Sequence, residues 1–289
     1  MKTPWYVPVL LGLLLVLLGV GVFLYPVISS YQAQQNQART ISSYVENIAE
    51  KQDDSIDSAM EEARRYNEAL AGDPVRDPFV PGSGYALPDN YQQVLNPGGD
   101  GIMGYLEIPK LGIRLPIGHG TSEEVLETMA GHIESTALPI GGPGTHSVLT
   151  GHRGLPSAEL LTRLDEMEDG DLFLVKILDQ TLAYQVDQIT TVLPYELQNL
   201  QTVPGKDFVT ILTCTPYGVN THRLLVRGQR TEYIPQQVQL QSPQVRYAGL
   251  NMKRLVEGTV LGFCMLAVLL IVLLLTTVIR RRRRRNSHD

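Results

Sequence analysis

The sequence predicts a mainly β domain flanked by two transmembrane helices. Its middle part contains many short apolar segments separated by turns, and this pattern favours a closed barrel or a sandwich over a doubly wound sheet. An apolar run stands near each end of the 289-residue chain. Each run is long enough to cross the hydrocarbon core of a bilayer as a helix, which takes about 20 residues. A helix is the expected form because no water is available there to bond the backbone.

The two predicted spans cover residues 7–28 and 256–279. Six arginines at 280–285 follow the second span directly, and Lys2 precedes the first. Basic residues stay on the cytoplasmic side of a membrane, so both termini are expected inside the cell and the domain between the spans outside. The first run could instead be a cleaved signal peptide. The SSYQAQQNQ sequence after it offers no convincing small-x-small cleavage site, which favours a retained anchor.

The charge of the chain excludes one class of function. The formal net charge is −6, from 24 basic and 30 acidic residues. Because six of the basic residues stand together at 280–285, the rest of the chain is more acidic than this total. An acidic domain with a single basic tail lacks the basic surface that binds phosphates, so no nucleic-acid partner is predicted.

The two cysteines lie in different environments. Cys264 falls within the second predicted span, so Cys214 is alone in the domain expected outside the cell, without a partner for an internal disulfide. A single thiol there is liable to oxidation, and keeping it calls for a reason. One interpretation is a reactive cysteine. The other is a buried, inert cysteine that packs as a small hydrophobic side chain.

The segment after the first span has a helical pattern. Apolar residues stand at positions 41, 44, 45 and 48 and again at 56, 60 and 63, which places them on one helical face. This spacing predicts one or two helices between residues 31 and 70. Gly72, Pro74 and Pro78 end the pattern, and residues 73–100 are rich in proline and glycine. A loop of that length in a compact domain is usually functional or disordered.

Short strands are predicted from residue 102 onward. They cover residues 103–108, 113–117, 147–151, 172–178, 181–191, 208–214 and 223–229. The fourth and fifth are joined through Asp179 and Gln180, as in a β-hairpin. Two short helices are predicted between strands, one at 123–130 and one at 158–167 after Pro156.

Cys214 ends one predicted strand, and Arg223 begins the next. Pro216 and Gly218 break the chain between them, so a hairpin can bring the two side chains together. A thiol must lose its proton to attack a carbonyl, and a nearby cation lowers its pKa. An arginine keeps its own proton, so it stabilises negative charge without acting as an acid.

A histidine could supply the proton transfer that a thiol nucleophile requires. The candidates outside the predicted spans and the tail are His119, His132, His146, His152 and His222. His152 is favoured because it follows a predicted strand and lies between Gly151 and Gly154, which would let a substrate backbone approach closely. His222 adjoins Arg223, and neighbouring strand residues point to opposite faces. His132 remains the rival, and each histidine taken singly is more often structural than catalytic.

Four motifs together resemble those of sortases. The Thr-Ile-Leu-Thr-Cys run ending at Cys214 is similar to the T-L-x-T-C signature of that family, with Ile in place of the usual Leu. The Thr-Gly-His run ending at His152 resembles the motif of the family's catalytic histidine, and Arg223 matches its essential arginine. Residues 130–144 resemble GHIxGTSLPIGG, although Glu-Ser at 134–135 departs from the usual small pair. The histidine of that stretch, His132, is usually treated as non-catalytic in the family, which favours His152.

A further motif resembles class C, the pilus-building sortases. The Asp-Pro-Phe sequence at 77–79 is similar to the lid of that class, a loop that crosses the active site. The resemblance implies that Asp77 lies near the cysteine and that the ring of Phe79 covers the pocket. The segment before this motif and the second span with its basic tail resemble class C as well. Without the resemblance, both residues would be assigned to a proline-rich connector with ordinary turn chemistry.

The resemblance implies a sortase-type closed β-barrel of about eight strands with short helices, and a cysteine transpeptidase without a cofactor. Cys214 would cleave an LPxTG-like sorting signal between Thr and Gly, His152 would carry the proton and Arg223 would stabilise charge. A lysine amine of another pilin subunit would then accept the acyl group. The expected organisation is a cytoplasmic N-terminus (1–6), a span (7–28), a helical segment (29–72), a lid and loop (73–100), the catalytic barrel (101–235), a juxtamembrane segment (236–255), a span (256–279) and a cytoplasmic tail (280–289).

Alternative functions remain at this point. A surface adhesin or pilin would also end in a span and basic residues, but it needs an LPxTG-like sequence just before the span, and residues 247–258 contain none. A cysteine hydrolase would use the same three residues and pass the acyl group to water. A housekeeping sortase would attach surface proteins to the cell wall. The acidic run at 165–171 lacks the spacing of an EF-hand loop, so no metal is predicted.

Overall fold

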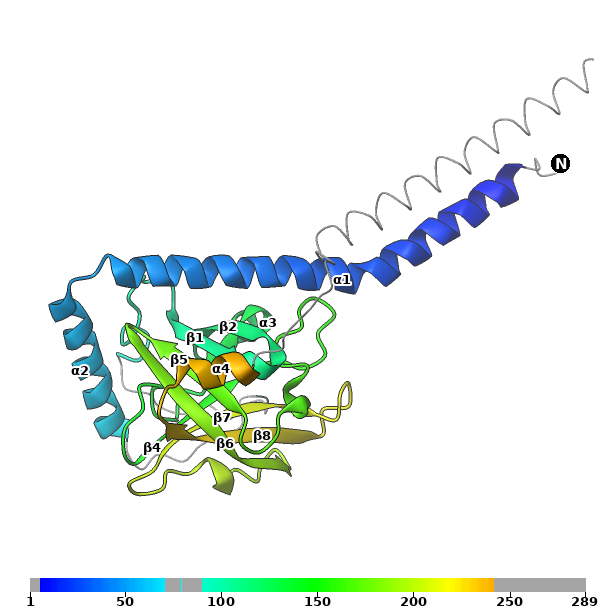
Figure 1. The fold of residues 1–289 in the computed structure, drawn as a ribbon. Helices are drawn as coiled ribbons and strands as arrows, with labels where there is room; N and C mark the ends of the chain where they lie inside the picture. The colour runs from blue at the N-terminus through cyan, green and yellow to red at the C-terminus, as the bar shows by residue number, and fades with distance from the viewer. Residues whose placement is uncertain (1–5, 71–78, 80–89, 242–289) are drawn as a thin grey trace, which may run out of the picture. The chain divides into compact units, whose positions relative to one another are not determined.

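A computed structural model describes residues 6–70, 79 and 90–241 (Figure 1). The predicted second span, the basic tail, Cys264 and Asp77 lie outside the described residues, as does most of the predicted lid and loop. The chain divides into two compact units. The unit that carries the predicted site is Ser29–Pro243, and the remainder includes the first part of helix α1.

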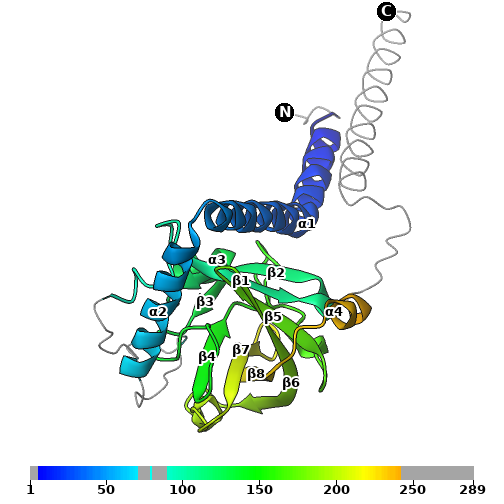
Figure 2. The same cartoon turned by 60° about the vertical axis from the view of Figure 1, so that its left-hand side comes forward.

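Helix α1 (Tyr6–Ala49) runs from the predicted first span into the globular unit. It is the one helix among the described residues that is long and apolar enough to cross a membrane. From Ser29 onward it lies along the barrel (Figures 1 and 2). Tyr44 anchors it there, because its hydroxyl donates to the Met103 carbonyl at 2.8 Å and accepts from the Leu178 N–H at 2.7 Å.

Helix α2 (Asp53–Leu70) follows α1 after a short turn and covers a second side of the barrel (Figure 2). Its buried face consists of Ile56, Met60, Ala63, Tyr66 and Leu70. The two helices confirm the prediction from apolar spacing over residues 31–70. Their buried side chains join the same hydrophobic cluster as the barrel interior, so both are part of the domain rather than a tether to it.

Eight strands in the described part of the chain close into a barrel in the order β1-β2-β3-β4-β7-β8-β6-β5. They are β1 (Ile102–Ile108), β2 (Ile113–His119), β3 (Ala130–His132), β4 (Thr145–Thr150), β5 (Leu172–Ile177), β6 (Gln180–Val192), β7 (Asp207–Thr215) and β8 (His222–Thr231). Neighbours are antiparallel except for the parallel pairs β2–β3 and β4–β7. The predicted closed barrel of about eight strands is confirmed.

Short helices occupy the connections between strands. Helix α3 (Glu123–Thr128) begins at Ser122, whose hydroxyl accepts from the Val125 N–H at 3.4 Å, and it links β2 to β3. The remaining short helices are η1 (Pro109–Leu111), η2 (Leu164–Glu166), η3 (Gln198–Leu200) and α4 (Pro235–Gln241). The predicted helix at 123–130 is therefore confirmed, although it ends before β3 begins.

Three details of the prediction are wrong. Strand β3 was not predicted, because three residues are too few to show an alternating pattern. The helix predicted at 158–167 is a series of turns with only the short η2, since Leu160 adopts φ 41°, a left-handed conformation that an α-helix cannot contain. The β5–β6 turn lies at Leu178 and Asp179, one residue earlier than predicted, because Ile177 pairs with Gln180.

Candidate active site

Cys214 and Arg223 face each other across two strands. The antiparallel ladder between β7 and β8 pairs them directly, one near the end of β7 and the other near the start of β8. Directly opposite residues in such a ladder lie on the same face of the sheet. The sequence predicted that a hairpin would bring Cys214 and Arg223 together, and the β7–β8 register places them opposite each other.

His152 approaches the same place from the neighbouring strand. Strands β4 and β7 run parallel, and Thr150 pairs with Leu212 at the end of their ladder. His152 and Cys214 each come two residues later along their own segments. The Gly151 N–H donates to the Leu212 carbonyl at 3.3 Å, which keeps the two segments together beyond the paired residues.

A hydrophobic cluster on the outer face of the barrel forms the base of this site. It consists of Ile133, Val148, Val192, Leu200, Leu212 and Leu225, with Leu197 and Phe79 packed against it. Leu212 and Leu225 stand two residues from Cys214 and Arg223 along β7 and β8, and they also pair with each other. Because side chains alternate across a strand, the thiol and the guanidinium lie on this outer face rather than in the barrel interior.

Phe79 contacts two of the three candidate residues. Its ring centroid lies 5.6 Å from that of His152, and the Arg223 guanidinium carbon lies 5.2 Å from the same ring centroid. Cys214 and Arg223 are both buried, with exposed fractions of 7% and 4%. The ring of Phe79, more than sixty residues before His152 in the sequence, therefore covers part of the site.

The guanidinium of Arg223 is also held by its own loop. Its Nη1 donates to the Asn220 carbonyl at 3.1 Å and to the His222 carbonyl at 3.2 Å. Asn220 adopts φ 61°, a left-handed turn that asparagine tolerates better than most residues. The turn between β7 and β8 thus fixes the charged group before any ligand arrives.

The ring of His152, which is partly exposed, differs from those of the buried histidines. Both ring nitrogens of His119 contact backbone carbonyls, those of Gly101 and Val94, at 2.9 and 2.7 Å. His146 contacts the Gln201 carbonyl and the Thr210 hydroxyl at 3.0 and 2.7 Å. Within the described residues, the ring of His152 makes no hydrogen bond, so both of its nitrogens are open to a ligand.

His132, the rival candidate, lies in the interior. Its Nδ1 is 2.9 Å from the hydroxyl of Tyr91, and its Nε2 is 2.9 Å from the Ala137 carbonyl. Burial lowers its pKa to about 4, so the ring is neutral at physiological pH. Burial also lowers the pKa of His152, and the charges of Glu123 and Glu127 oppose that lowering.

The glycines beside His152 are closely packed by side chains of the protein. A side chain at Gly151 would come within 3.0 Å of Leu161, and one at Gly154 within 2.9 Å of the Tyr217 ring. Both positions therefore require glycine for packing within the protein, and close approach of a substrate backbone stays a prediction. Gly154 also adopts φ 83°, which a larger residue would find strained.

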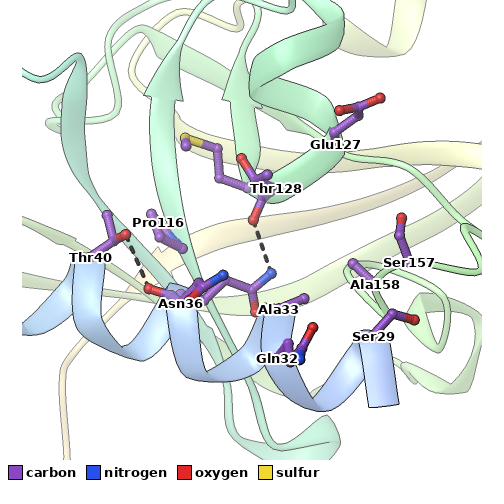
Figure 3. Close-up of a pocket in the computed structure, with 12 residues that line it drawn as sticks. Ser29, Gln32, Ala33, Asn36, Thr40, Pro116, Glu127, Thr128, Ser157 and Ala158 are labelled. Atoms are coloured by element: carbon purple, nitrogen blue, oxygen red, sulfur yellow. Dashed lines mark hydrogen bonds between the residues drawn. The ribbon is translucent and has the colours of Figure 1, made fainter. Parts of the chain in front are cut away.

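A separate pocket of about 310 Å³ lies between α1 and the end of α3 (Figure 3). Residues of α1 such as Gln32 and Asn36 line one side, and Pro116, Glu127 and Ser157 are among those lining the other. Cys214, His152 and Arg223 do not line it. In the described residues, no group of three or more His, Cys, Asp or Glu side chains could hold a metal ion.

Comparisons with known proteins identify the family. The sortase domain model matches residues 106–231. The crystal structure of sortase C1 from Streptococcus agalactiae is 44% identical, covers 68% of this chain and 100% of its own, and superposes with a TM-score of 0.63. That of Streptococcus pneumoniae sortase C is 40% identical, covers 68% and 97%, and gives 0.62.

Among curated relatives, sortase SrtE1 of Streptomyces coelicolor is 30% identical over 171 residues, which are 54% of this chain and 43% of that protein. The chain spans about half the length of the curated relatives it matches. The solved structures, in contrast, are matched over nearly their whole length at 40% identity or more. This chain belongs to the sortase family.

Proposed function

We propose that the protein is a class C sortase, a cysteine transpeptidase that joins pilin subunits through LPxTG-like sorting signals. The observation that carries the proposal is the meeting of Cys214, Arg223 and the segment of His152 on one face of the barrel, beneath Phe79. Two neighbours in structure are sortases C, and the pneumococcal one is described in terms of its pilin substrate specificity.

In the first step, the Cys214 sulfur adds to the carbonyl carbon between Thr and Gly of the sorting signal. Arg223 donates hydrogen bonds to the oxygen that becomes negative, a contribution worth about 3–4 kcal/mol in other enzymes. His152, as an imidazolium, protonates the departing glycine amine while the C–N bond breaks. The product is a thioester between Cys214 and the threonine carbonyl.

In the second step, a lysine amine of another pilin attacks the thioester carbonyl. His152 now accepts a proton from the amine, the C–S bond breaks and the Cys214 thiolate is restored. The new bond is an isopeptide. Burial lowers the pKa of His152 from its ordinary value of about 6.5, so the imidazolium that protonates the leaving amine is a minor form of the protein at neutral pH.

We assign a lid to the segment around Asp77 and Phe79. The contacts of the Phe79 ring with His152 and Arg223 support this assignment, and Asp77 is included from its place in the motif alone. A substrate that reaches Arg223 must displace the ring. The lid would therefore limit access to Cys214 until a sorting signal binds.

The N-terminal apolar helix suggests a membrane anchor. We propose that a second span at 256–279 makes the protein two-pass, with both termini in the cytoplasm and residues 29–255 outside. This placement puts the thiol on the side of the membrane where pilin subunits assemble.

A direct test uses the full-length protein in membranes, incubated with candidate pilins. Mass spectrometry should detect a thioester at Cys214 and an isopeptide between a sorting-signal threonine and a pilin lysine. The Cys214→Ala variant should form neither product. Release of the free threonine acid without any isopeptide would make the protein a hydrolase, and absence of a thioester would reject the proposal.

A further inference from the structure

Two threonines flank Cys214, and each one is bonded to a residue that flanks His152. The hydroxyl of Thr213 donates to the Gly151 carbonyl at 2.7 Å. On the other side, Nη1 of Arg153 donates to the hydroxyl of Thr215 at 3.1 Å. The two segments that carry the proposed nucleophile and the proposed acid are thus tied together both before and after these residues.

Arg153 uses all three of its guanidinium nitrogens within the domain. Besides the bond to Thr215, its Nε donates to the Thr162 carbonyl at 3.1 Å, and its Nη2 forms an ion pair with Asp165. The Arg153 side chain is only 9% exposed, while that of Asp165 is 50% exposed. A guanidinium that donates to acceptors in three directions is held rigidly, because its planar group cannot rotate without losing several of these bonds.

Two further hydrogen bonds hold the backbone around His152. The His152 carbonyl accepts from the Leu161 N–H at 3.3 Å, and the Gly154 N–H donates to the Thr162 hydroxyl at 3.1 Å. Residues 152–154 therefore lie against the turn that contains residues 161–165. Arg153 connects this pair of segments to the end of β7, next to Cys214.

We propose that Arg153 is a positioning residue, which acts through Thr215 to set the place of His152 relative to Cys214. The inference rests on the proposed function, since it assumes that these two side chains exchange a proton with a shared substrate. The ring of His152 makes no hydrogen bond of its own in the described residues, so its placement depends on its backbone and on packing. A displacement near 1 Å at a reacting group costs about 100-fold in rate.

The sharpest variant is Thr215→Val, which keeps the shape of the side chain and removes the oxygen that accepts from Arg153. We expect kcat for thioester formation to fall about 10- to 100-fold while KM changes less than about threefold. Thr215→Ser keeps the oxygen and should restore most of the rate. Arg153→Lys keeps the charge, loses the planar fork and should resemble Thr215→Val.

Thr221→Val provides the matched control. Its hydroxyl lies in the same β7–β8 loop and contacts only the His222 ring, at 2.9 Å, among the described residues. This variant should keep the wild-type rate. Thermal unfolding of each full-length variant shows whether a loss of rate comes from a loss of folded protein.

The pH profile of Cys214 alkylation by iodoacetamide gives a readout that needs no substrate. Displacement of His152 should shift this profile in Thr215→Val and Arg153→Lys, and leave it unchanged in Thr215→Ser and Thr221→Val. Identical profiles in all four variants, with kcat within about twofold of the wild type, would overturn the positioning role and leave the proposed function standing. If the wild type forms no thioester, the proposed function fails, and the alkylation profiles still decide whether Arg153 sets the environment of Cys214.

Discussion

His132 and His152 both follow a glycine at or just beyond the end of a strand, yet the fold gives them opposite surroundings. His132 is fully buried, and its two ring nitrogens contact the Tyr91 hydroxyl and the Ala137 carbonyl. His152 is partly exposed, and its ring lies against Phe79 rather than against a hydrogen-bonding group of the described residues. The ring nitrogens of His132 are therefore both bonded within the interior, whereas those of His152 are available to a ligand.

The contrast shows what separates a structural histidine from a candidate catalyst in this fold. A ring whose nitrogens are both bonded cannot take up or release a proton without breaking a buried contact. A ring held by packing and by its backbone can do so.

Replacement of His152 by alanine should lower kcat/KM for sorting-signal cleavage by about 1,000-fold, since general acid–base groups contribute between 100- and 10,000-fold. The midpoint of thermal unfolding should stay near that of the wild type, because the His152 ring makes no hydrogen bond with any described residue. His222→Ala is the control and should keep its activity. Residual activity within tenfold of the wild type would remove His152 from the mechanism.

A variant that removes the hydrogen-bond partner of the buried His132 should lower stability and leave activity unchanged. Tyr91→Phe removes a hydroxyl that faces His132 Nδ1 and accepts from the Gly120 N–H at 2.9 Å. The free energy of unfolding should fall by about 1–3 kcal/mol, the cost of leaving buried polar groups unpaired. Activity per folded molecule should not change. Tyr195→Phe, at a residue that is 76% exposed, is the control for stability measured in urea.

Acid should destabilise the protein through the buried rings. Burial lowers the pKa of both His132 and His146 from 6.5 to about 4. Between these values the unfolded chain binds protons that the folded rings do not, so the free energy of unfolding should fall as the pH drops from 6.5 toward 4. The slope is about 1.4 kcal/mol per pH unit for each ring.

Urea unfolding at a series of pH values measures this slope. His132→Gln removes one titrating group and should flatten the pH dependence, whereas Tyr195→Phe, at an exposed ring, should leave it unchanged. A slope that stays the same in His132→Gln would mean that the buried ring does not titrate as its surroundings imply.

The smallest effect is expected at the ring that covers His152. Phe79→Ala removes contacts with His152 and with the Arg223 guanidinium, each on the order of 1 kcal/mol. The rate of Cys214 alkylation should rise a few-fold, and deletion of residues 73–82 should raise it at least as much. An unchanged alkylation rate in both variants would remove the lid from the proposed function. Tyr195→Ala, at an exposed ring, is the control.

Much of the fold follows from the sequence because its signals are local. Alternating apolar residues locate seven of the eight strands, and the apolar spacing at positions 41–63 locates α1 and α2. Strand β3 is missed because its three residues pair only through neighbours distant in the chain, β2 and β4. The helix predicted at 158–167 fails because Leu160 adopts a left-handed conformation and the Leu161 N–H bonds to the His152 carbonyl. The backbone bonds within this segment are those of short turns and of η2.

The candidate site follows from the sequence only in part. Cys214 and Arg223 are joined by a short turn, so their pairing can be expected from a hairpin alone. The contacts of Arg153 with Thr215 and Thr162 could not be expected, because they depend on how three separate segments meet. The packing of Leu161 and Tyr217 onto the two glycines beside His152 depends in the same way on the folded chain.

The hydroxyl of Tyr44 has a consequence for any shortened form of this protein. It joins α1 to β1 and to the β5–β6 turn through two bonds, and α2 adds five buried side chains to the barrel core. A fragment limited to residues 106–231 would leave the Leu178 N–H without its acceptor and would expose that apolar surface to water. A crystallisable or assayable domain must therefore begin near Ser29, where the same helix that leads out of the predicted anchor starts to support the enzyme.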